Sequence, residues 1–137
     1  MSDELAIVCV DDEEMVLVAL RQQISDAIGD ECIIEVSTSG EEALEIIQEL
    51  VEEENASIVL IVSDWLMPGM KGDEFLIKAH AICPKVEKIM LSGQADAEAI
   101  QRAKKEANLR EFISKPWDAE YLIGVIKEAL TLKKQNI

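Results

Sequence analysis

Apolar residues occur along the chain in short runs that recur at regular intervals. Five of these runs have the length of a β-strand, and they are LAIVCV (5–10), CIIEV (32–36), SIVLIV (57–62), KIML (88–91) and EFI (111–113). The first and third runs are nearly continuous in β-branched and aliphatic residues, which is typical of central strands in a parallel sheet that is covered on both faces.

The segments between these runs have helical periodicity. Helices are expected from about Glu14 to Ile28, after Ser39, from Gly72 to just before Pro84, over residues 96–107, and from near Pro116 onward. Gly29 is a C-terminal signal for the first helix, and Ser39 with Glu42 forms an S-x-x-E capping box for the second. Pro84 disfavours helix in the residue before it, which ends the third.

The fourth helical segment, residues 96–107, differs from the others in its apolar face. Apolar burial contributes roughly 25 cal/mol per Å², so a helix held mainly by alanines gains little from packing and is expected to shift at low cost. Its expected inward residues are Ala97, Ile100, Ala103 and Ala107, whereas the last helix has Leu122, Val125, Ile126, Ala129 and Leu130 on one face.

Alternation of five strands with five helices predicts an α/β three-layer sandwich built from right-handed βαβ crossovers. The length of 137 residues fits one domain over residues 1–137.

Charge limits the classes of partner. Acids outnumber bases 28 to 13, giving a formal net charge of -15, so direct nucleic-acid binding and attachment to anionic lipid are not expected. Seven of the acids lie in residues 40–56, which we interpret as the solvated face of one helix. No apolar run approaches the ~18 residues of a membrane span, and Cys9, Cys32 and Cys83 resemble reduced buried thiols, so a cytoplasmic location is expected.

Polar residues follow the strand-like runs where candidate chemistry is expected. Ligands of open parallel sheets bind outside the carboxyl ends of the strands, so residues at these ends should meet. The second run is followed only by Ser37 and Thr38, as expected for an edge strand away from the site. The residues that follow the first, third, fourth and fifth runs are Asp11 and Asp12, Asp64, Ser92, and Lys115.

Three carboxylates that converge would repel one another by roughly 1 to 4 kcal/mol per pair, so a cation is expected among them. Oxygen ligands without His or Cys favour Mg²⁺. Lys115 adds a second cation and Ser92 a hydroxyl donor, which together suit phosphoryl transfer. Asp64 is the best candidate nucleophile, because a carboxylate can carry a phosphoryl group as an acyl phosphate.

The segments VDDEE, SDWLMPGMKG, LSG and SKPW, in this order and at these spacings, resemble a response-regulator receiver domain of two-component signalling over essentially the whole chain. The resemblance implies a (βα)5 flavodoxin-like fold with a five-stranded parallel sheet of order 2-1-3-4-5. It also implies Mg²⁺-dependent transfer of a phosphoryl group from a sensor histidine kinase or a phosphotransfer protein.

By position, the resemblance assigns a role to each residue of the site. Asp64 corresponds to the phosphorylated aspartate, Asp12 to a direct Mg²⁺ ligand and Asp11 to a ligand through water. The metal would also be held by Asp64 itself and by the backbone carbonyl of Leu66.

The resemblance also implies a switch. Ser92 corresponds to the hydroxyl residue that bonds the phosphoryl oxygen, Lys115 to the lysine that pairs with it, and Phe112 to the aromatic switch residue. Leu66 and Gln94 lie at the positions that tune dephosphorylation, and an apolar Leu66 cannot orient a water for fast hydrolysis.

Phosphorylation of Asp64 would add charge and acceptor oxygens that draw in Ser92 and Lys115. The fourth helix, fifth strand and last helix would then change their common face toward an effector protein, an output domain or a second copy in a phosphorylation-dependent homodimer.

Two other functions compete with this hypothesis. A Mg²⁺-dependent phosphohydrolase with an aspartyl-phosphate intermediate usually has a second acid two residues after its nucleophile, where this chain has Leu66. A receiver-like module that binds its partner without phosphorylation would not need the acidic, hydroxyl and lysine set. The chain is therefore expected not to be an enzyme beyond its own self-phosphorylation and autodephosphorylation.

Some single residues carry expectations of their own. The KVEK segment (85–88) is expected to be solvated and His80 to lie on the surface. Gly124 would mark close packing in the last helix, and Trp65 and Trp117, if exposed, would be partner contacts or fluorescent reporters.

Overall fold

The computed structural model of the chain describes residues 4–53 and 56–135. Its single sheet is parallel, with the spatial order β2-β1-β3-β4-β5 that the receiver resemblance implied. The strands are β1 (Leu5–Val10), β2 (Cys32–Ser37), β3 (Ser57–Ser63), β4 (Glu87–Ser92) and β5 (Glu111–Ser114). All five predicted strands are thus confirmed, with β2 at an edge.

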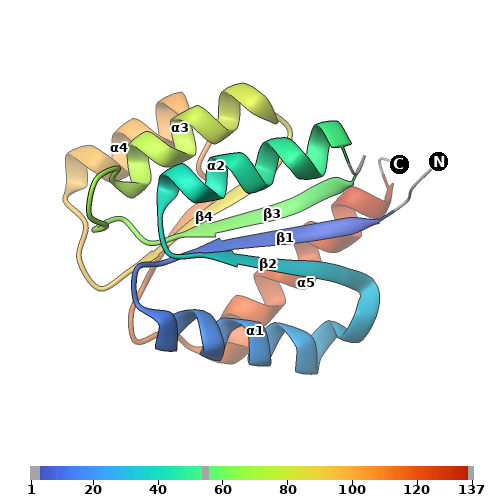
Figure 1. Cartoon of the computed structure of the whole chain (residues 1–137). Coiled ribbons are helices and arrows are strands. Elements are labelled where there is room, and N and C mark those ends of the chain that lie inside the picture. Colours follow the sequence, from blue (N-terminus) through green and yellow to red (C-terminus); the bar gives the residue numbers. More distant parts are fainter. Residues whose placement is uncertain (1–3, 54–55, 136–137) are drawn as a thin grey trace.

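Five α-helices cover the two faces of the sheet. They are α1 (Glu14–Ile28), α2 (Gly40–Gln48), α3 (Gly72–Ile82), α4 (Ala97–Glu106) and α5 (Ala119–Gln135), with a 3-10 turn at Gly29–Glu31 and a π-helical turn at Glu49–Glu53. Helices α2, α3 and α4 lie on one face and α1 and α5 on the other, which confirms the three-layer sandwich (Figure 1). Among the described residues, no helix is long and apolar enough to cross a membrane.

The strand register brings the carboxyl ends of the central strands level with one another. Val10 of β1 pairs with Ser37 of β2 and with Ser63 of β3, so the residues that follow β1 and β3 begin side by side. A register shift after Ala6 in the pairing of β1 with β3 is the one irregularity recorded between these two strands. The functional residues therefore leave the sheet from a common edge.

The two faces of the sheet are packed differently at α4 and α5. Helix α5 buries the five apolar residues that were predicted, namely Leu122, Val125, Ile126, Ala129 and Leu130. Helix α4 buries only Ala99 and Ala103, with Ala107 directly after it and Ile100 half-buried. The expected inward position of Ala97 is wrong, because Ala97 opens the helix and is exposed while Ala99 turns toward the core. Helix α4 is nevertheless thinly anchored, as expected.

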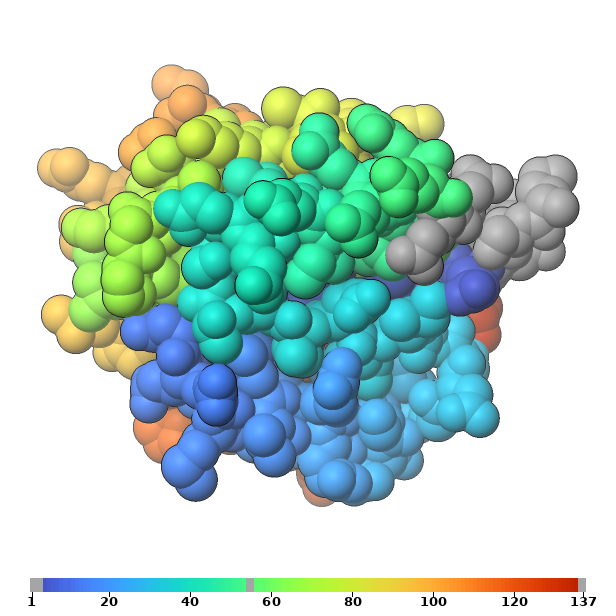
Figure 2. Space-filling view, in the orientation of Figure 1, coloured from blue at the N-terminus to red at the C-terminus, as the bar shows by residue number. Residues whose placement is uncertain are grey.

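The capping box of α2 forms only in part. The Ser39 hydroxyl accepts the backbone N–H of Glu42, as predicted, but the Glu42 carboxylate accepts the hydroxyl of Ser37 instead of returning to Ser39. The glutamates that follow are exposed, and their helix forms the front surface above α1 in the space-filling view (Figure 2). Glu54 of this segment lies outside the described residues.

Two expectations about single residues are wrong. Lys88 is 0% exposed, although KVEK was expected to be solvated, because Lys88 shares the sheet face of Met90 and points under α3. Gly124 does not mark close packing, since a Cβ there would meet nothing within 4 Å. The three cysteines are free, with Cys9 and Cys32 buried and Cys83 half-buried.

Candidate functional site

Backbone hydrogen bonds at the strand ends position the functional residues. The N–H of Asp64 donates to the Val10 carbonyl at 2.9 Å, and that of Lys115 donates to the Ser92 carbonyl at 3.0 Å. The N–H of Asp11 donates to Ser37 on the edge strand at 3.1 Å. Each bond extends the sheet ladder by one residue, so the side chains project from a rigid edge.

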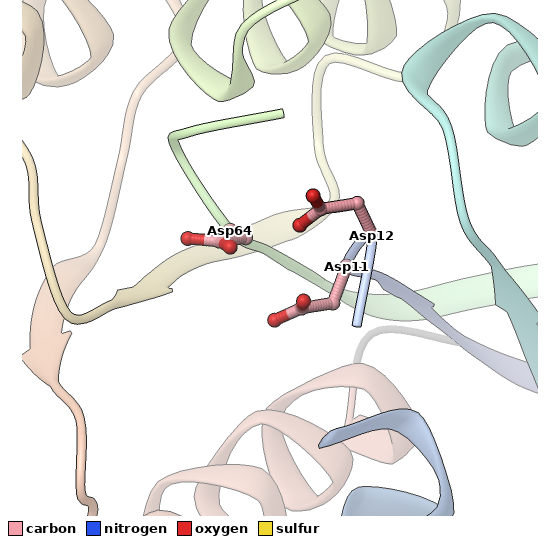
Figure 3. Close-up of side chains that lie close together, drawn as sticks. All are labelled: Asp11, Asp12 and Asp64. Atoms are coloured by element: carbon pink, nitrogen blue, oxygen red, sulfur yellow. The ribbon is translucent and has the colours of Figure 1, made fainter. Parts of the chain in front are cut away.

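The three aspartates form one acidic cluster. One carboxylate oxygen from each of Asp11, Asp12 and Asp64 lies within 4.8 Å of the others. Figure 3 shows the side chains of Asp11 and Asp12 extending from the end of β1 toward Asp64 at the end of β3. Asp12 is exposed while Asp11 and Asp64 are buried, so the cluster opens to solvent on one side. Oxygen donors at this spacing suit a hard divalent cation.

Lys115 is the cation that the cluster already contains. Its Nζ donates to Asp11 Oδ2 at 2.7 Å, reaches Asp64 Oδ2 at 3.4 Å and lies 3.9 Å from Glu13 Oε1. Burial acts to lower the pKa of Lys115, but its hydrogen bond to Asp11 and the charges of Asp11 and Asp64 outweigh burial, so the pKa is raised. Lys115 therefore carries a positive charge at neutral pH beside Asp11 and Asp64.

The pKa of Asp11 is set by opposing effects. Burial raises its pKa above the ordinary value, and the charge of Asp64 raises it further. The hydrogen bonds from Lys115 and from the Glu13 backbone N–H, at 2.8 Å, oppose this rise. Three carboxylates share one lysine, so the site keeps a negative charge that a metal ion can neutralise.

An open pocket of about 580 Å³ lies above this cluster. Ser92 and Leu66 line it together with Asp12, Asp64 and Lys115, so the structure brings the predicted site residues together. The Ser92 hydroxyl donates to the Gln94 carbonyl at 2.9 Å and so is engaged within its own loop. Leu66 is 44% exposed at the rim.

Phe112 does not line this pocket. It lies on β5 opposite Met90 of β4, and it is half-buried against the core beneath α2, α3 and α4. Its switch role remains a prediction.

Gly72 allows a close approach of two backbone segments behind the acceptor. Its N–H donates to the Trp65 carbonyl at 2.8 Å, and a Cβ at this position would lie 2.0 Å from the Asp64 carbonyl oxygen. No side chain fits there. The start of α3 is thereby packed directly on the residue that carries the candidate nucleophile.

A polar network surrounds Trp65 that the sequence did not predict. Trp65 is only 8% exposed, so the condition for a partner contact, an exposed side chain, is not met. Its indole Nε1 donates to Asp73 Oδ1 at 3.2 Å, and Arg102 of α4 donates to Asp73 Oδ2 at 3.2 Å. Lys71 lies over the indole at 4.9 Å from the ring centroid. An acid in the first turn of a helix is common, so Asp73 carried no signal in the sequence.

Trp117 is half-buried against the core on the opposite face of the sheet. Its Nε1 donates to Gln23 of α1 at 2.9 Å. Neither tryptophan is a freely exposed side chain.

Comparisons with curated proteins agree with this geometry. The chain is 30% identical over 131 residues to the hydrogenase transcriptional regulatory protein HoxA of Cupriavidus necator, which covers 95% of this chain and 25% of that protein. It is 30% identical over 97 residues to sporulation initiation phosphotransferase F of Bacillus subtilis, covering 71% of this chain and 73% of that one. The chain spans about a quarter of the length of the HoxA proteins that it matches.

Comparisons with solved structures and with family models agree. A CheY-like response regulator receiver domain protein from Methanospirillum hungatei has a TM-score of 0.83 at 29% identity, with 99% of this chain and 100% of that one covered. The observed fold is the flavodoxin-like receiver fold. The family model for the response regulator receiver domain matches residues 7–127. The chain thus belongs to the response regulator receiver domains of two-component systems.

Proposed function

We propose that this receiver domain accepts a phosphoryl group on Asp64. The observation that carries the proposal is the position of the Asp64 carboxylate between the acidic pair of β1 and the Lys115 ammonium, at the floor of an open pocket. Lys115, directly after β5, contacts both Asp11 and Asp64, and the side chains of Asp11 and Asp12, directly after β1, extend toward Asp64.

The residues present fit a Mg²⁺ ion. Asp12 and Asp64 would be direct ligands, Asp11 would act through water, and the backbone carbonyl of Leu66 would complete the protein ligands. A bound Mg²⁺ would supply positive charge against the oxygens of the incoming phosphoryl group.

The chemical step balances as a simple displacement. A carboxylate oxygen of Asp64 attacks phosphorus and forms the P–O bond of an acyl phosphate. The bond from phosphorus to the donor breaks, and the donor atom keeps the electron pair, whether it is the imidazole nitrogen of a phosphohistidine or the oxygen of acetyl phosphate. Lys115 and the Ser92 hydroxyl then receive the phosphoryl oxygens, with Ser92 giving up its bond to Gln94.

Removal of the phosphoryl group is expected to be slow. Hydrolysis requires a water held in line with phosphorus. The two positions that tune dephosphorylation, Leu66 and Gln94, are both exposed at the pocket, and of these two side chains only that of Gln94 is polar. Leu66 has no donor or acceptor with which to hold that water. Leu66 also lies two residues after Asp64, where a phosphohydrolase of the competing kind usually has its second acid.

The switching face in the proposal consists of α4, β5 and α5. Ser92 ends β4 directly before the loop to α4, so a new bond from Ser92 to the phosphoryl group would pull on that loop. The half-buried Phe112 and the thinly anchored α4 are the parts that can follow. We infer a sensor histidine kinase or phosphotransfer protein as donor. An effector protein, an output domain or a second copy would read the changed face.

Intact-mass measurement after incubation with acetyl phosphate and Mg²⁺ tests the proposal. The wild-type chain should gain the mass of one phosphoryl group, while Asp64→Asn and an EDTA-treated sample should not. An equal gain in Asp64→Asn, or no gain in wild type, would contradict the assignment.

Two further outcomes separate the competing functions. Continuous release of phosphate, many turnovers per chain, would indicate a phosphohydrolase. Identical partner affinity for phosphorylated wild type and Asp64→Asn would indicate a binding module that does not use phosphorylation.

A further inference from the structure

A buried carboxylate lies between the phosphoacceptor loop and helix α4. Asp73, in the first turn of α3, is 7% exposed and uses its two oxygens for two different partners. Oδ1 accepts the indole N–H of Trp65, and Oδ2 accepts a guanidinium N–H of Arg102, which lies 29 residues further along the chain. These contacts join three segments: the loop after β3, helix α3 and helix α4.

This polar contact matters for α4 because apolar packing holds that helix weakly. The fully buried residues of α4 are two alanines, so little apolar surface opposes a shift of the helix along the sheet. A directional bond from Arg102 to a buried carboxylate adds a specific restraint at the middle of the helix. Arg102 is half-exposed and the network borders an open polar pocket of about 460 Å³, so water can replace the bond when it opens.

The same network ends at the acceptor itself. Trp65 directly follows Asp64, and its backbone N–H donates to Asp64 Oδ1 at 2.7 Å. The position of the indole, fixed by Asp73 and by the Lys71 ammonium over the ring, therefore fixes the amide that orients the Asp64 carboxylate. One chain of contacts runs from the acceptor carboxylate to α4 without passing through Ser92.

We propose that Asp73 is a positioning residue that fastens α4 to the phosphoacceptor loop in the unphosphorylated chain, through Trp65 on one oxygen and Arg102 on the other. The inference rests on the proposed function. We call the Trp65–Asp73–Arg102 contacts the tether. When Ser92 is drawn to the phosphoryl group, α4 must shift, and the hydrogen bond from Arg102 to Asp73 opposes this shift. Phosphorylation and the tether thus favour different positions of α4. By linkage, phosphorylation weakens the bond from Arg102 to Asp73, and that bond weakens binding of the phosphoryl group or its mimic.

Beryllofluoride, which mimics an acyl phosphate on a carboxylate, provides the test in an NMR titration at fixed Mg²⁺. Arg102→Gln, which removes the charged arm, is expected to bind beryllofluoride about threefold more tightly than wild type, the size expected for a partly exposed ion pair. Asp73→Asn keeps an oxygen for the indole but loses the charge, and should shift the affinity in the same direction. Arg102 also pairs with the exposed Glu106 at 3.7 Å, so Glu106→Gln is the matched control and should bind like wild type.

The possible results distinguish failure of the tether from failure of the proposed acceptor. Equal affinity of Arg102→Gln and wild type, weaker binding by Arg102→Gln, or tighter binding by Glu106→Gln to the same extent would overturn the tether. Failure of wild type to bind beryllofluoride at all, or binding by Asp64→Asn, would instead contradict the proposed acceptor. The free energy of unfolding of Arg102→Gln in urea should fall by about 0.7 kcal/mol, which is the threefold change in affinity expressed as free energy. A much larger loss would indicate a general disturbance of the fold and would overturn the tether.

Discussion

The buried Lys88 and the half-buried Lys115 lie at opposite ends of the sheet, and their surroundings differ. Lys115, at the carboxyl end, has Asp11 at 2.7 Å and Asp64 at 3.4 Å. Lys88, near the amino end of β4, donates to the Val86 carbonyl at 2.7 Å and lies 3.1 Å from His80 Nδ1, with no carboxylate in either contact. The net environment raises the pKa of Lys115, whereas burial lowers the pKa of Lys88.

The difference separates a charge that the proposed phosphoryl transfer would use from a charge whose burial costs stability. Around Lys115 the carboxylates outnumber the cation, an arrangement that suits a divalent cation, and in the proposed function that cation and Lys115 would together offset the charge of the phosphoryl oxygens. At the amino end, the hydrogen bonds of Lys88 go to neutral acceptors and the charge of nearby Glu87 does not offset desolvation, so the charged form is costly to the fold. Four measurements test whether the two lysines differ in this way.

The largest effect is expected from Lys115→Met. Removal of the ammonium leaves the buried Asp11 carboxylate without its cation, so the free energy of unfolding in EDTA should fall by about 3 kcal/mol. Urea unfolding measures this change. Lys127→Met, an exposed lysine of α5, is the control and should change stability by less than about 0.5 kcal/mol. A loss below about 1 kcal/mol would mean that solvent already screens the pair.

Lys88→Met should have the opposite sign. Methionine fills a similar volume without a charge to desolvate, so the free energy of unfolding at neutral pH should rise by about 1.5 kcal/mol. Lys85→Met, an exposed lysine three residues earlier in sequence, is the matched control. A destabilised Lys88→Met would show that the bonds to Val86 and His80 outweigh the cost of desolvation.

Magnesium should stabilise only the carboxyl end. At 10 mM Mg²⁺, a site with a dissociation constant of about 1 mM raises the free energy of unfolding by about 1.4 kcal/mol, which thermal unfolding can follow. Asp12→Asn should abolish the increase, whereas Lys88→Met should leave it unchanged. The same stabilisation in Asp12→Asn would place the ion elsewhere.

The smallest effect concerns pH at the amino end. Burial, and then the charge of Lys88, lower the pKa of His80 from its ordinary value of 6.5. Below pH 6.5 the unfolded chain therefore binds a proton that the folded chain does not, so stability falls as pH decreases through this window.

His80→Gln, which keeps an acceptor for Lys88 but does not titrate, isolates this contribution. Its stability should fall less than that of wild type between pH 7.5 and pH 5.5 in urea unfolding. Equal losses in the two proteins would assign the pH dependence to other groups.

The sequence predicted the sheet, the helices and the carboxyl-end cluster because each depends on local periodicity and on where a strand ends. Asp11, Asp64 and Lys115 directly follow strands, and parallel topology brings strand ends together. Their convergence therefore needed no knowledge of side-chain packing.

What the sequence did not predict depends on contacts between distant segments. Burial of Lys88 requires His80 above it, and burial of Trp65 requires Asp73 and Arg102. Ala97 was wrongly predicted to face inward because α4 has alanines on several sides of its axis. The alanine positions alone therefore did not define which face of α4 packs on the sheet.

The close approach at Gly72 also fixes the position of α3 relative to Asp64. Because its first turn rests on the Asp64 carbonyl, with no room for a single additional carbon, α3 cannot tilt without carrying the acceptor along. Helix α4 beside it has no such contact with the backbone of the sheet edge among the described hydrogen bonds. The distance between spin labels at the exposed Lys78 of α3 and Lys104 of α4 can therefore be measured with α3 as the fixed reference. A change in that distance would report the displacement of α4 alone.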